Sequence, residues 1–395
     1  MSSDFLEWAN LFVRWFHVIV GIGWIGTSFF FMALDAHLTL AANAKKHSTG
    51  KIWLIHSGGY YEVEKLDYVP PGQIPFLHWF KWEAYLTGIS GLMLLFIVYY
   101  FGGGLMVDPN VAHIGHWESV GIGIAAIAGG WALYEVIWRS PLNRFEGLMN
   151  LFCFLLLVAM AYGLSLVLSG RAAYMHVGAM MGIIMVANVL VIIQPSQRRM
   201  VRANRAGQVP DPAWGHAAKQ RSVHNNYLTL PVVFVMISNH FPNTYAEKWN
   251  WAILIALFLV GAGVRYFLNT YDGGSRVAPY VLGGAVAAAI VLALVTTVPM
   301  SGGAVLRQHV SFAEADAVIG HRCVECHSAH PSDNVYHQAP MGIRFDTAHE
   351  IAGLVPKIKL MAVDTEAMPL GNKTGMTPHE RALLRAWLAE GAPLD

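Results

Sequence analysis

The sequence is poor in charged residues. Only 13% of its 395 residues are Asp, Glu, Lys or Arg, whereas about a quarter of the residues are charged in an ordinary soluble domain. Hydrophobic residues make up 55% and the mean hydropathy is +0.43, which excludes a soluble globular protein and predicts one embedded in lipid. The formal net charge of +1 provides no field for nucleic acid, so membrane lipid is expected as a partner and nucleic acid is not.

Cysteine is also scarce, which excludes a disulfide framework. Of the three cysteines, Cys153 stands alone in an apolar run, where a small buried side chain is expected. The other two belong to a Cys-Val-Glu-Cys-His motif at 323–327, a spacing that attaches one haem through both thiols and places a histidine on its iron. A zinc site would need a second ligand pair, and the sequence has no other CxxC. We predict one covalent haem c on Cys323 and Cys326, with His327 as an iron ligand.

Long apolar runs recur along the chain, and runs of about 17–25 residues can cross a bilayer as helices. The N-terminus lacks a basic segment and a small-residue cleavage site, so the first run is expected to remain as a span. The predicted fold class is all-α: a polytopic membrane helical bundle with a C-terminal periplasmic c-type cytochrome domain. The eight spans are expected at 10–34, 79–101, 118–138, 147–169, 173–194, 226–241, 249–270 and 278–299.

Lysine and arginine are concentrated in the loops that follow the odd-numbered spans, which identifies these loops as cytoplasmic. The opposite loops hold little beyond Arg171 and Lys248. Both termini are therefore predicted on the periplasmic side of a bacterial inner membrane, where haem c is attached. The basic residues of the odd loops are Lys45, Lys46, Lys51, Lys65, Arg139, Arg144, Arg198, Arg199, Arg202, Arg205, Lys219, Arg221 and Arg276.

Two of the predicted cytoplasmic loops carry structural signals of their own. Residues 51–56 and 60–65 flank a glycine turn and predict a small hairpin near 51–65. The longer basic loop, at about 195–225, contains Pro195, Pro210 and Pro212. Because proline interrupts helices, this loop is expected to be irregular or only partly helical.

The composition turns polar after the last span. Helices are expected over 312–319, ahead of the haem motif, and from Pro378 onwards, where Thr377 and Glu380 form a capping box. The predicted domains are a membrane domain at 1–300, a linker at 301–309 and a cytochrome domain at 310–395.

The second axial ligand of the haem is expected between those two helices. Met368 is the favoured candidate because Pro369 follows it in a rigid extended segment that can hold a thioether against iron. A His/Met pair raises the reduction potential of a haem, which suits an electron acceptor. Met361 and Met376 are the other main candidates, with ordinary packing as their alternative role, and His337 or Met341 could serve instead.

Ionisable side chains inside apolar spans are costly and usually serve a cavity, a proton path or a cofactor. His17, His176 and His240 lie toward the periplasm and are candidates for holding one or more b-type haems, His17 and His176 as iron ligands. Solvated or hydrogen-bonded helix ends are the alternative. Glu83 and Glu135 are candidates for accepting protons from a substrate, or for pairing with Lys81 and Arg139.

The segment 221–231 concentrates donors and acceptors at a membrane boundary. His224, Asn225 and Asn226 stand together in it, and such a group can bind a polar heterocycle or a haem edge. Capping of the sixth helix by one of the asparagines is the alternative. These three residues and the two glutamates are the candidate catalytic residues.

Three sequence features form one constellation. They are RWFHV at 14–18 with GIGWIG at 21–26, HNNYLTLP at 224–231 with MISNH at 236–240, and the C-terminal CxxCH. Together they resemble the bacterial membrane-bound, cytochrome-c-linked urate oxidases, also called urate hydroxylases. The resemblance implies oxidation of urate to 5-hydroxyisourate with water as the oxygen source, and transfer of electrons to haem c and a respiratory acceptor, such as a soluble cytochrome c or a terminal oxidase.

Two other functions remain open at this stage. One is a membrane-anchored electron-transfer cytochrome that serves a separate dehydrogenase; the other is a quinol-linked oxidoreductase subunit, for which the cue is a polar pocket that opens into lipid. Electron tunnelling weakens steeply with distance, so a cytoplasmic urate site would require an intermediate redox centre such as haem b. The sequence leaves the oligomeric state open.

Overall fold

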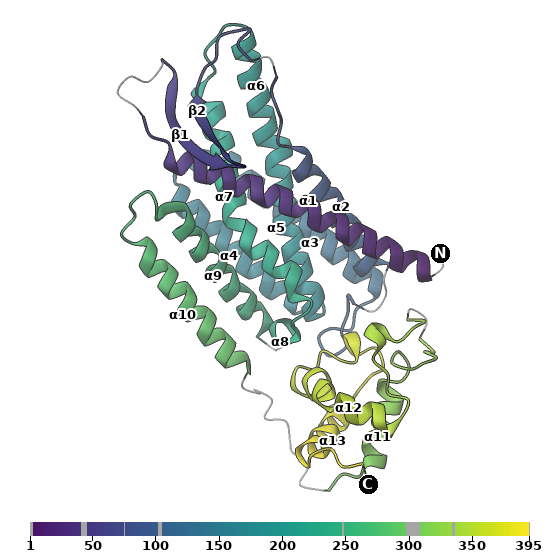
Figure 1. Cartoon of the computed structure of the whole chain (residues 1–395). Helices are drawn as coiled ribbons and strands as arrows, with labels where there is room; N and C mark the ends of the chain where they lie inside the picture. The colour runs from purple at the N-terminus through teal and green to yellow at the C-terminus, as the bar shows by residue number, and fades with distance from the viewer. Residues whose placement is uncertain are drawn as a thin grey trace.

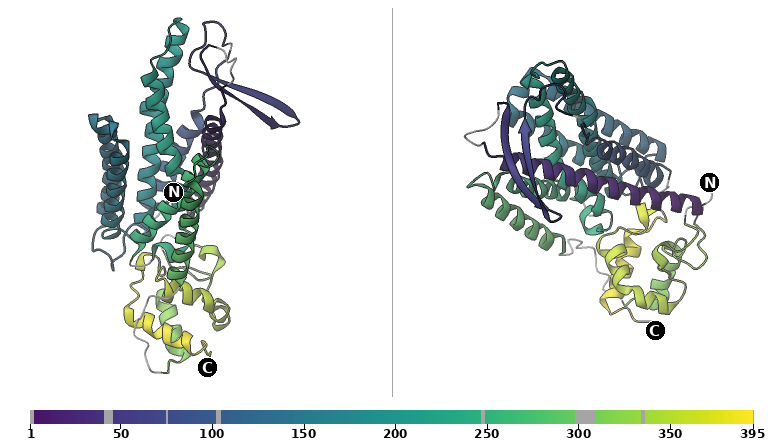
Figure 2. Two further views of the ribbon diagram at one scale, coloured as in Figure 1. Left: turned by 90° about the vertical axis from the view of Figure 1, so that its left-hand side faces the viewer. Right: turned by 45° about the horizontal axis from the view of Figure 1, so that its top comes forward.

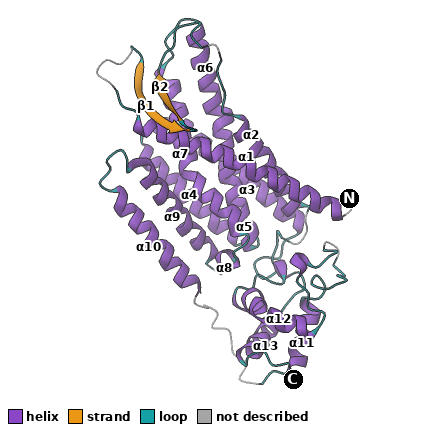
Figure 3. Ribbon diagram, in the orientation of Figure 1, coloured by secondary structure: helices purple, strands orange, loops and turns teal. Residues whose placement is uncertain are grey.

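The computed structural model describes residues 3–40, 46–74, 76–101, 105–246, 249–297, 309–333 and 336–394. These residues form a bundle of long helices, a two-stranded hairpin and a smaller helical C-terminal domain (Figure 1). Helix dominates throughout, and strands occur only in the hairpin within the ranges just given (Figure 3). The predicted predominance of helix is confirmed.

Long helices form at all eight predicted spans. Seven of them are long and apolar enough to cross a membrane, among the described residues. The remaining one, α7, starts earlier than expected and contains Arg221, His224, Asn225 and Asn226, which lower its hydropathy. The bundle consists of α1 (Ser3–His37), α2 (Trp82–Leu95) with η1 (Phe96–Tyr100), α3 (His116–Arg139), α4 (Glu146–Ser165), α5 (Gly170–Ala187) with η3 (Asn188–Ile193) and α6 (Gln194–Arg205), α7 (Pro212–Ser238), the short α8 (Pro242–Tyr245), α9 (Asn250–Thr270) and α10 (Ala278–Thr297).

The prediction of an irregular basic loop at about 195–225 is largely wrong. Helix runs without a break from α5 through the π-helical η3 to the end of α6, and α7 begins at Pro212. Proline in the first helical turn removes no hydrogen bond, and Asp211 Oδ1 caps the helix by accepting from Ala213 N at 2.9 Å. The basic segment therefore forms a helical extension that projects from the bundle beside the hairpin (Figure 1).

The predicted hairpin is confirmed. β1 (Ser48–His56) and β2 (Gly59–Leu66) pair antiparallel, with His56 opposite Gly59. Ser57 and Gly58 form the two-residue turn, with φ of 51° and 76°, which is the left-handed geometry that tight hairpins require. Asp35 at the end of α1 pairs with Lys65 of β2 at 2.6 Å and with Lys219 of α7, so the hairpin is tied to the bundle.

Helix α5 lies at the centre of the bundle. Of the 18 consecutive residues that make up the most apolar stretch of its span, 61% are buried inside the protein. The corresponding share is 22% or less in the other six apolar helices. Glycines on neighbouring helices allow this close packing. A Cβ added at Gly123 of α3 would lie 2.4 Å from His176 Nε2, and one added at Gly178 of α5 would lie 2.5 Å from Val235 Cγ1.

The C-terminal domain has a hydrophobic core of its own. Both predicted helices are confirmed, as α11 (Phe312–Arg322) and α13 (Pro378–Ala389), and the latter begins with the expected capping box. The other helical segments described there are η4 (Pro340–Gly342), α12 (Ala348–Ile358), η5 (Lys359–Asp364) and η6 (Leu370–Asn372). The core includes Ile319, Ile351, Leu384 and Trp387, all fully buried. The predicted linker at 301–309 lies outside the described residues up to position 308.

The C-terminal domain and the hairpin lie at opposite ends of the bundle (Figures 1 and 2). Leu370 of the C-terminal domain packs against the bundle core, which includes Leu105, Met106 and Leu168. This contact places the segment around Met368 against the end of the bundle that lies far from the hairpin.

Because α3 and α5 pack closely at Gly123, a methyl group added at this position should destabilise the fold. Gly123→Ala should lower the free energy of unfolding by about 1–3 kcal/mol, because the rigid His176 ring must move to admit the added carbon. The measurement is thermal unfolding of the purified full chain in detergent. Gly121→Ala on the same helix is the control, because a Cβ there meets nothing within 4 Å. Equal losses in both variants would contradict the packing argument.

Candidate functional site

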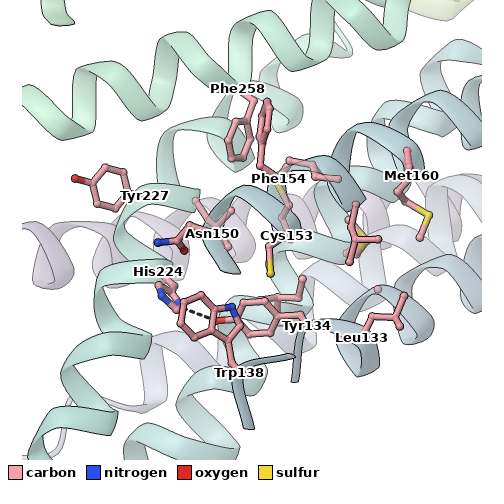
Figure 4. Close-up of a pocket in the computed structure, with 18 of the residues that line it drawn as sticks. Leu133, Tyr134, Trp138, Asn150, Cys153, Phe154, Met160, His224, Tyr227 and Phe258 are labelled. Atoms are coloured by element: carbon pink, nitrogen blue, oxygen red, sulfur yellow. Dashed lines mark hydrogen bonds between the residues drawn. The ribbon is translucent and has the colours of Figure 1, made fainter. Parts of the chain in front are cut away.

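A cavity of about 1040 Å³ lies between α3, α4, α5, α7 and α9. Apolar side chains line most of it, including Leu133, Phe154, Met160 and Phe258 (Figure 4). Pockets for drug-sized ligands measure about 300–1,000 Å³. The cavity therefore has more room than a single small metabolite needs.

The cavity extends along most of the bundle. It is lined from Ile122 to Trp138 on α3 and from Glu146 to Leu164 on α4. At a rise of about 1.5 Å per residue, these stretches are roughly 24–27 Å long. The polar lining gathers at the hairpin end, where α3 ends and α4 begins, and the far end is apolar.

His224 of α7 lines the polar end of the cavity. Its ring lies 4.2 Å from that of Trp138, centroid to centroid, and its Nδ1 lies 2.7 Å from the Tyr134 hydroxyl (Figure 4). Asn188 Nδ2 donates to the same hydroxyl oxygen at 3.0 Å, so the Tyr134 proton is directed to His224 Nδ1. A neutral His224 then carries its own proton on Nε2, an atom with no hydrogen-bond partner in the described part of the chain.

A buried network of asparagine side chains is hydrogen-bonded to the Tyr134 hydroxyl. Besides its bond to Tyr134, Asn188 Nδ2 donates to Asn225 Oδ1 at 2.8 Å, and Asn225 Nδ2 donates to the Met185 carbonyl at 2.9 Å. Asn188 and Asn225 are 2% and 6% exposed. Satisfied buried networks of this kind hold their members in one arrangement. Asn225 thus acts on the cavity only through Asn188 and Tyr134.

Glu135 is held in an ion-pair network. Its two carboxylate oxygens lie 2.5 Å from Arg139 Nε and 3.0 Å from Arg221 Nη2. Arg221 also donates to Asn188 Oδ1 at 3.3 Å and lies over the Tyr134 ring at 4.9 Å. The pairing with Arg139, considered above as the alternative to proton acceptance, is therefore present, and Glu135 does not line the cavity.

Asn150, His216, Lys219, Gln220 and Tyr227 also line this end of the cavity, and two further groups there, on Trp138 and Glu146, have chemistry suited to a ligand. The indole Nε1 of Trp138 is buried and forms no hydrogen bond to a nitrogen or oxygen atom; its neighbour is the thiol of Cys153, a weak acceptor that lines the same cavity. Glu146 lies at the mouth, where its Oε1 accepts a hydrogen bond from Gln220 Nε2 at 2.7 Å. The site thus offers two N–H donors, from His224 and Trp138, and a carboxylate.

The structure does not bring Glu83 and Asn226 to this cavity. Asn226 is fully buried among α7 and α9, where its Oδ1 accepts hydrogen bonds from Arg265 and Asn269. Glu83 lies between α2 and α1, with its Cγ close to Gly23. Of the five candidate catalytic residues, only His224 lines the cavity.

The candidate haem-b histidines are also separated. His17 contacts α2 at Ser90 Oγ, 2.9 Å from its Nδ1. The Nε2 of His176 lies 3.2 Å from the Tyr100 hydroxyl. Ser90 and Tyr100 are ten residues apart on α2 and η1, or about 15 Å along the helix axis. The two histidines thus contact different levels of the α2–η1 helix, and haem ligation by this pair stays a prediction.

His176 is fully enclosed and His240 is not. His176 is 0% exposed, its Nδ1 lies 2.8 Å from the Ala172 carbonyl, and Gly123 leaves no space beside its Nε2. His240 is exposed beyond the end of α7, and its Nδ1 lies 3.3 Å from the Ile237 carbonyl of the preceding turn. Each Nδ1 thus has a carbonyl partner, and at His176 the Nε2 side is closed by Gly123 and the Tyr100 hydroxyl.

The CxxCH segment fits haem attachment. His327 Nδ1 lies 3.0 Å from the Ile343 carbonyl, so Nδ1 carries the proton and Nε2 remains available for iron. Burial lowers the pKa of His327, which favours the neutral ligand form. Cys323 and Cys326 form no disulfide, and burial raises the pKa of both thiols to about 12, so both are protonated at neutral pH.

Met361 and Met368 are the half-buried candidates among the possible sulfur ligands, and the backbone of Met368 is held on both sides. The Met368 N–H donates to the Met361 carbonyl at 2.8 Å, and the Met368 carbonyl accepts from Arg381 Nη1 at 2.8 Å. Met341 is 92% exposed and His337 is exposed too. Met376 is 2% exposed in the domain core, which is the packing role considered above.

Sequence reasoning missed Tyr134, Trp138 and Asn188. All three side chains are uncharged at neutral pH, so none of them carries the charge that marks an ionisable residue within an apolar run. Asn188 interrupts the run VANVLVII, and an amide in such a run needs internal partners just as a charge does. That signal was available in the sequence.

The network around Asn188 predicts a large loss on substitution. Asn188→Leu should lower the midpoint of thermal unfolding, because Tyr134, Asn225 and Arg221 each lose a buried partner at about 1–3 kcal/mol per unsatisfied group. Leu190→Ala on the same helical segment, where the side chain is 49% exposed, is the control and should change little. A midpoint for Asn188→Leu equal to that of the control would contradict the network.

Comparison with known proteins gives one family. A family model described as urate oxidase N-terminal matches residues 3–297, which span α1 to α10. No curated protein and no solved structure matches the chain. The C-terminal domain lies outside the matched residues.

Proposed function

Because the chain belongs to the urate oxidase N-terminal family, we propose that it is a membrane-embedded oxidoreductase that hydroxylates urate. Urate and water would give 5-hydroxyisourate, two protons and two electrons. The proposal places the seven apolar helices and α7 as eight spans in a bacterial inner membrane, with the arginine-rich α6 and the hairpin in the cytoplasm and both termini in the periplasm.

The observation that carries the proposal is the pair of N–H groups without a nitrogen or oxygen acceptor at the polar end of the cavity, His224 Nε2 and Trp138 Nε1. A buried donor without a strong acceptor is costly, and urate offers carbonyl oxygens and a delocalised negative charge to both donors. The Trp138 ring provides a flat wall for a planar bicycle. Urate would fill only this end of a much longer cavity.

The residues have separate roles in this proposal. Tyr134 holds His224 with Nε2–H toward the ligand, and Asn188 and Arg221 hold Tyr134. Glu146 lines the same cavity at its mouth and is the carboxylate that accepts the protons lost by water. Donors that are fixed in advance stabilise charge without reorganising during the reaction.

The C-terminal domain is proposed to receive the electrons. Cys323 and Cys326 would hold one haem c covalently, with His327 and Met368 as its axial ligands, and the bound haem would accept one electron at a time. The Nδ1–Ile343 carbonyl contact of His327, which leaves Nε2 available, supports the assignment of this histidine. Because Leu370 packs on the bundle, the Met368 side of the haem would face the membrane domain, and a soluble cytochrome c or a terminal oxidase would collect electrons from the other side.

One observation favours a second candidate function. The cavity is long and mostly apolar, which also suits the ring and tail of a membrane quinone, with His224 and Trp138 as donors to the quinone oxygens. In that case the membrane domain would belong to a quinol-linked oxidoreductase. Reduction of the haem by a quinol, but not by urate, is the result that would select this function.

Haem reduction by urate tests the main proposal. Anaerobic addition of urate to the purified full chain should reduce the haem c absorption bands. Trp138→Phe and His224→Gln should slow the reduction by about 10²–10³-fold, because each removes one fixed donor. His240→Gln, an exposed histidine outside the cavity, is the control and should reduce at the wild-type rate. Equal rates in all four proteins would reject the cavity as the urate site.

Haem content tests the C-terminal assignment independently of urate. The wild-type chain should give a pyridine haemochrome spectrum of c type and keep its haem after acid–acetone extraction, since thioether bonds resist it. Cys323→Ala with Cys326→Ala should lose the covalent haem. Met368→Leu should keep it but lower the midpoint potential, because a thioether ligand raises the potential. A wild-type chain without covalent haem would refute the assignment.

A further inference from the structure

Arg265 of α9 is a buried cation without a counterion. It is 3% exposed, and no carboxylate in the described ranges pairs with it. Its Nε donates to Asn226 Oδ1 at 3.1 Å and its Nη2 to Asn269 Oδ1 at 2.9 Å, and both amides are neutral. A charge in an apolar bundle normally has a partner of opposite sign, so this arrangement lacks an anion.

Asn226 has an unpaired donor at the same place. Its Oδ1 accepts from Arg265 and from Asn269 Nδ2 at 2.8 Å, which fixes the orientation of the amide. Its Nδ2 has no partner, although the residue is 0% exposed. Arg265 Nη1 makes no hydrogen bond within the described part of the chain either. Asn226 Nδ2 and Arg265 Nη1 are therefore two N–H donors without an acceptor in the described residues.

An aromatic ring lies against the Arg265 guanidinium, and a buried carboxylate oxygen lies farther along, beside α1. The Arg265 guanidinium carbon lies 3.8 Å from the centroid of the Phe29 ring of α1, which is a stacked cation–π contact. Glu83 Oε2 is buried without a partner, beside Gly23 of α1. Gly23 and Phe29 are six residues apart, or about 9 Å along the helix.

This group of residues is distinct from the cavity. Positions 224 and 226 are separated by roughly 200° around a helix of 3.6 residues per turn, so His224 and Asn226 point to opposite sides of α7. His224 lines the cavity, whereas Asn226 meets α9 on the side where α1 contacts both helices. Neither Asn226 nor Arg265 lines the cavity.

We propose that Arg265 and Asn226 form a second binding site, between α1, α7 and α9, for a planar organic monoanion of the urate class. The anion would compensate the guanidinium charge and accept hydrogen bonds from Asn226 Nδ2 and Arg265 Nη1. Its ring N–H groups would suit the unpaired Glu83 oxygen. The inference rests on the proposed function in taking urate as the substrate, and it adds a site that no step of the oxidation uses.

The test is the stoichiometry of urate binding. Equilibrium dialysis of labelled urate is performed on the full chain in detergent, kept fully reduced so that urate is not consumed. The wild type should bind two urates per chain. Arg265→Gln and Asn226→Leu should each bind one, and Trp138→Phe should lose the other. Arg265→Lys keeps the charge and should bind two, with the second weaker by about tenfold. Arg276→Gln, which changes an exposed arginine in the next loop, should also bind two.

Several results would overturn the inference. Two urates of unchanged affinity in a folded Arg265→Gln chain, verified by thermal unfolding, would show that the site does not exist. Displacement by inorganic phosphate, or tight binding only in nanodiscs of anionic lipid and not of phosphatidylcholine, would identify a phosphate or lipid-headgroup site instead. One urate in the wild type, lost in Trp138→Phe alone, would reject this inference and leave the proposed function intact. No urate binding in the wild type would reject both.

Discussion

An apolar bundle cannot supply water to a polar group, so each polar side chain inside it needs a partner within the protein or in a ligand. Helix α7 contains several of these polar side chains. It carries Arg221, His224, Asn225 and Asn226 within two turns and lies in contact with α5, α6 and α9. The arrangement of the neighbouring helices follows from where those four side chains find their partners.

Each side of α7 meets the requirement differently. Toward α3 and η3, Arg221 and Asn225 are fully engaged by Glu135 and Asn188, and the network is closed. Toward the cavity, His224 is fixed on one nitrogen and free on the other. Toward α9, Asn226 accepts two bonds and donates none. The closed side gives rigidity, and the two open sides are where ligands are proposed to bind.

The long cavity bears on how electrons would cross the bundle. Its polar end lies near the hairpin, its apolar end lies toward Leu164 and Ile122, and the C-terminal domain packs beyond that end through Leu370. His17 and His176 each contact a hydroxyl of the α2–η1 helix, at positions ten residues apart. The proposed path from urate to haem c therefore depends on what fills the apolar part of the cavity.

Much of the fold could be predicted because it follows from local chemistry. Hydropathy located the eight long helices, the Ser-Gly-Gly turn located the hairpin, and the capping box located α13. The proline rule failed at 195–225 because Pro212 occupies a first helical turn, where proline is harmless. The sequence also predicted the CxxCH site, since haem attachment needs only five consecutive residues.

The membrane sites could not be derived in the same way. Which of His17, His176 and His224 faces a cavity, and which is closed by a glycine or a hydroxyl, depends on helix rotation and on packing between residues 73 to 90 positions apart in the chain. The sequence by itself determined the lipid-compatible helices, the hairpin and the haem motif, because those depend on neighbouring residues. Only the tertiary structure decided that Tyr134 orients His224 and that Arg265 lacks a counterion, because those facts depend on which distant helices meet.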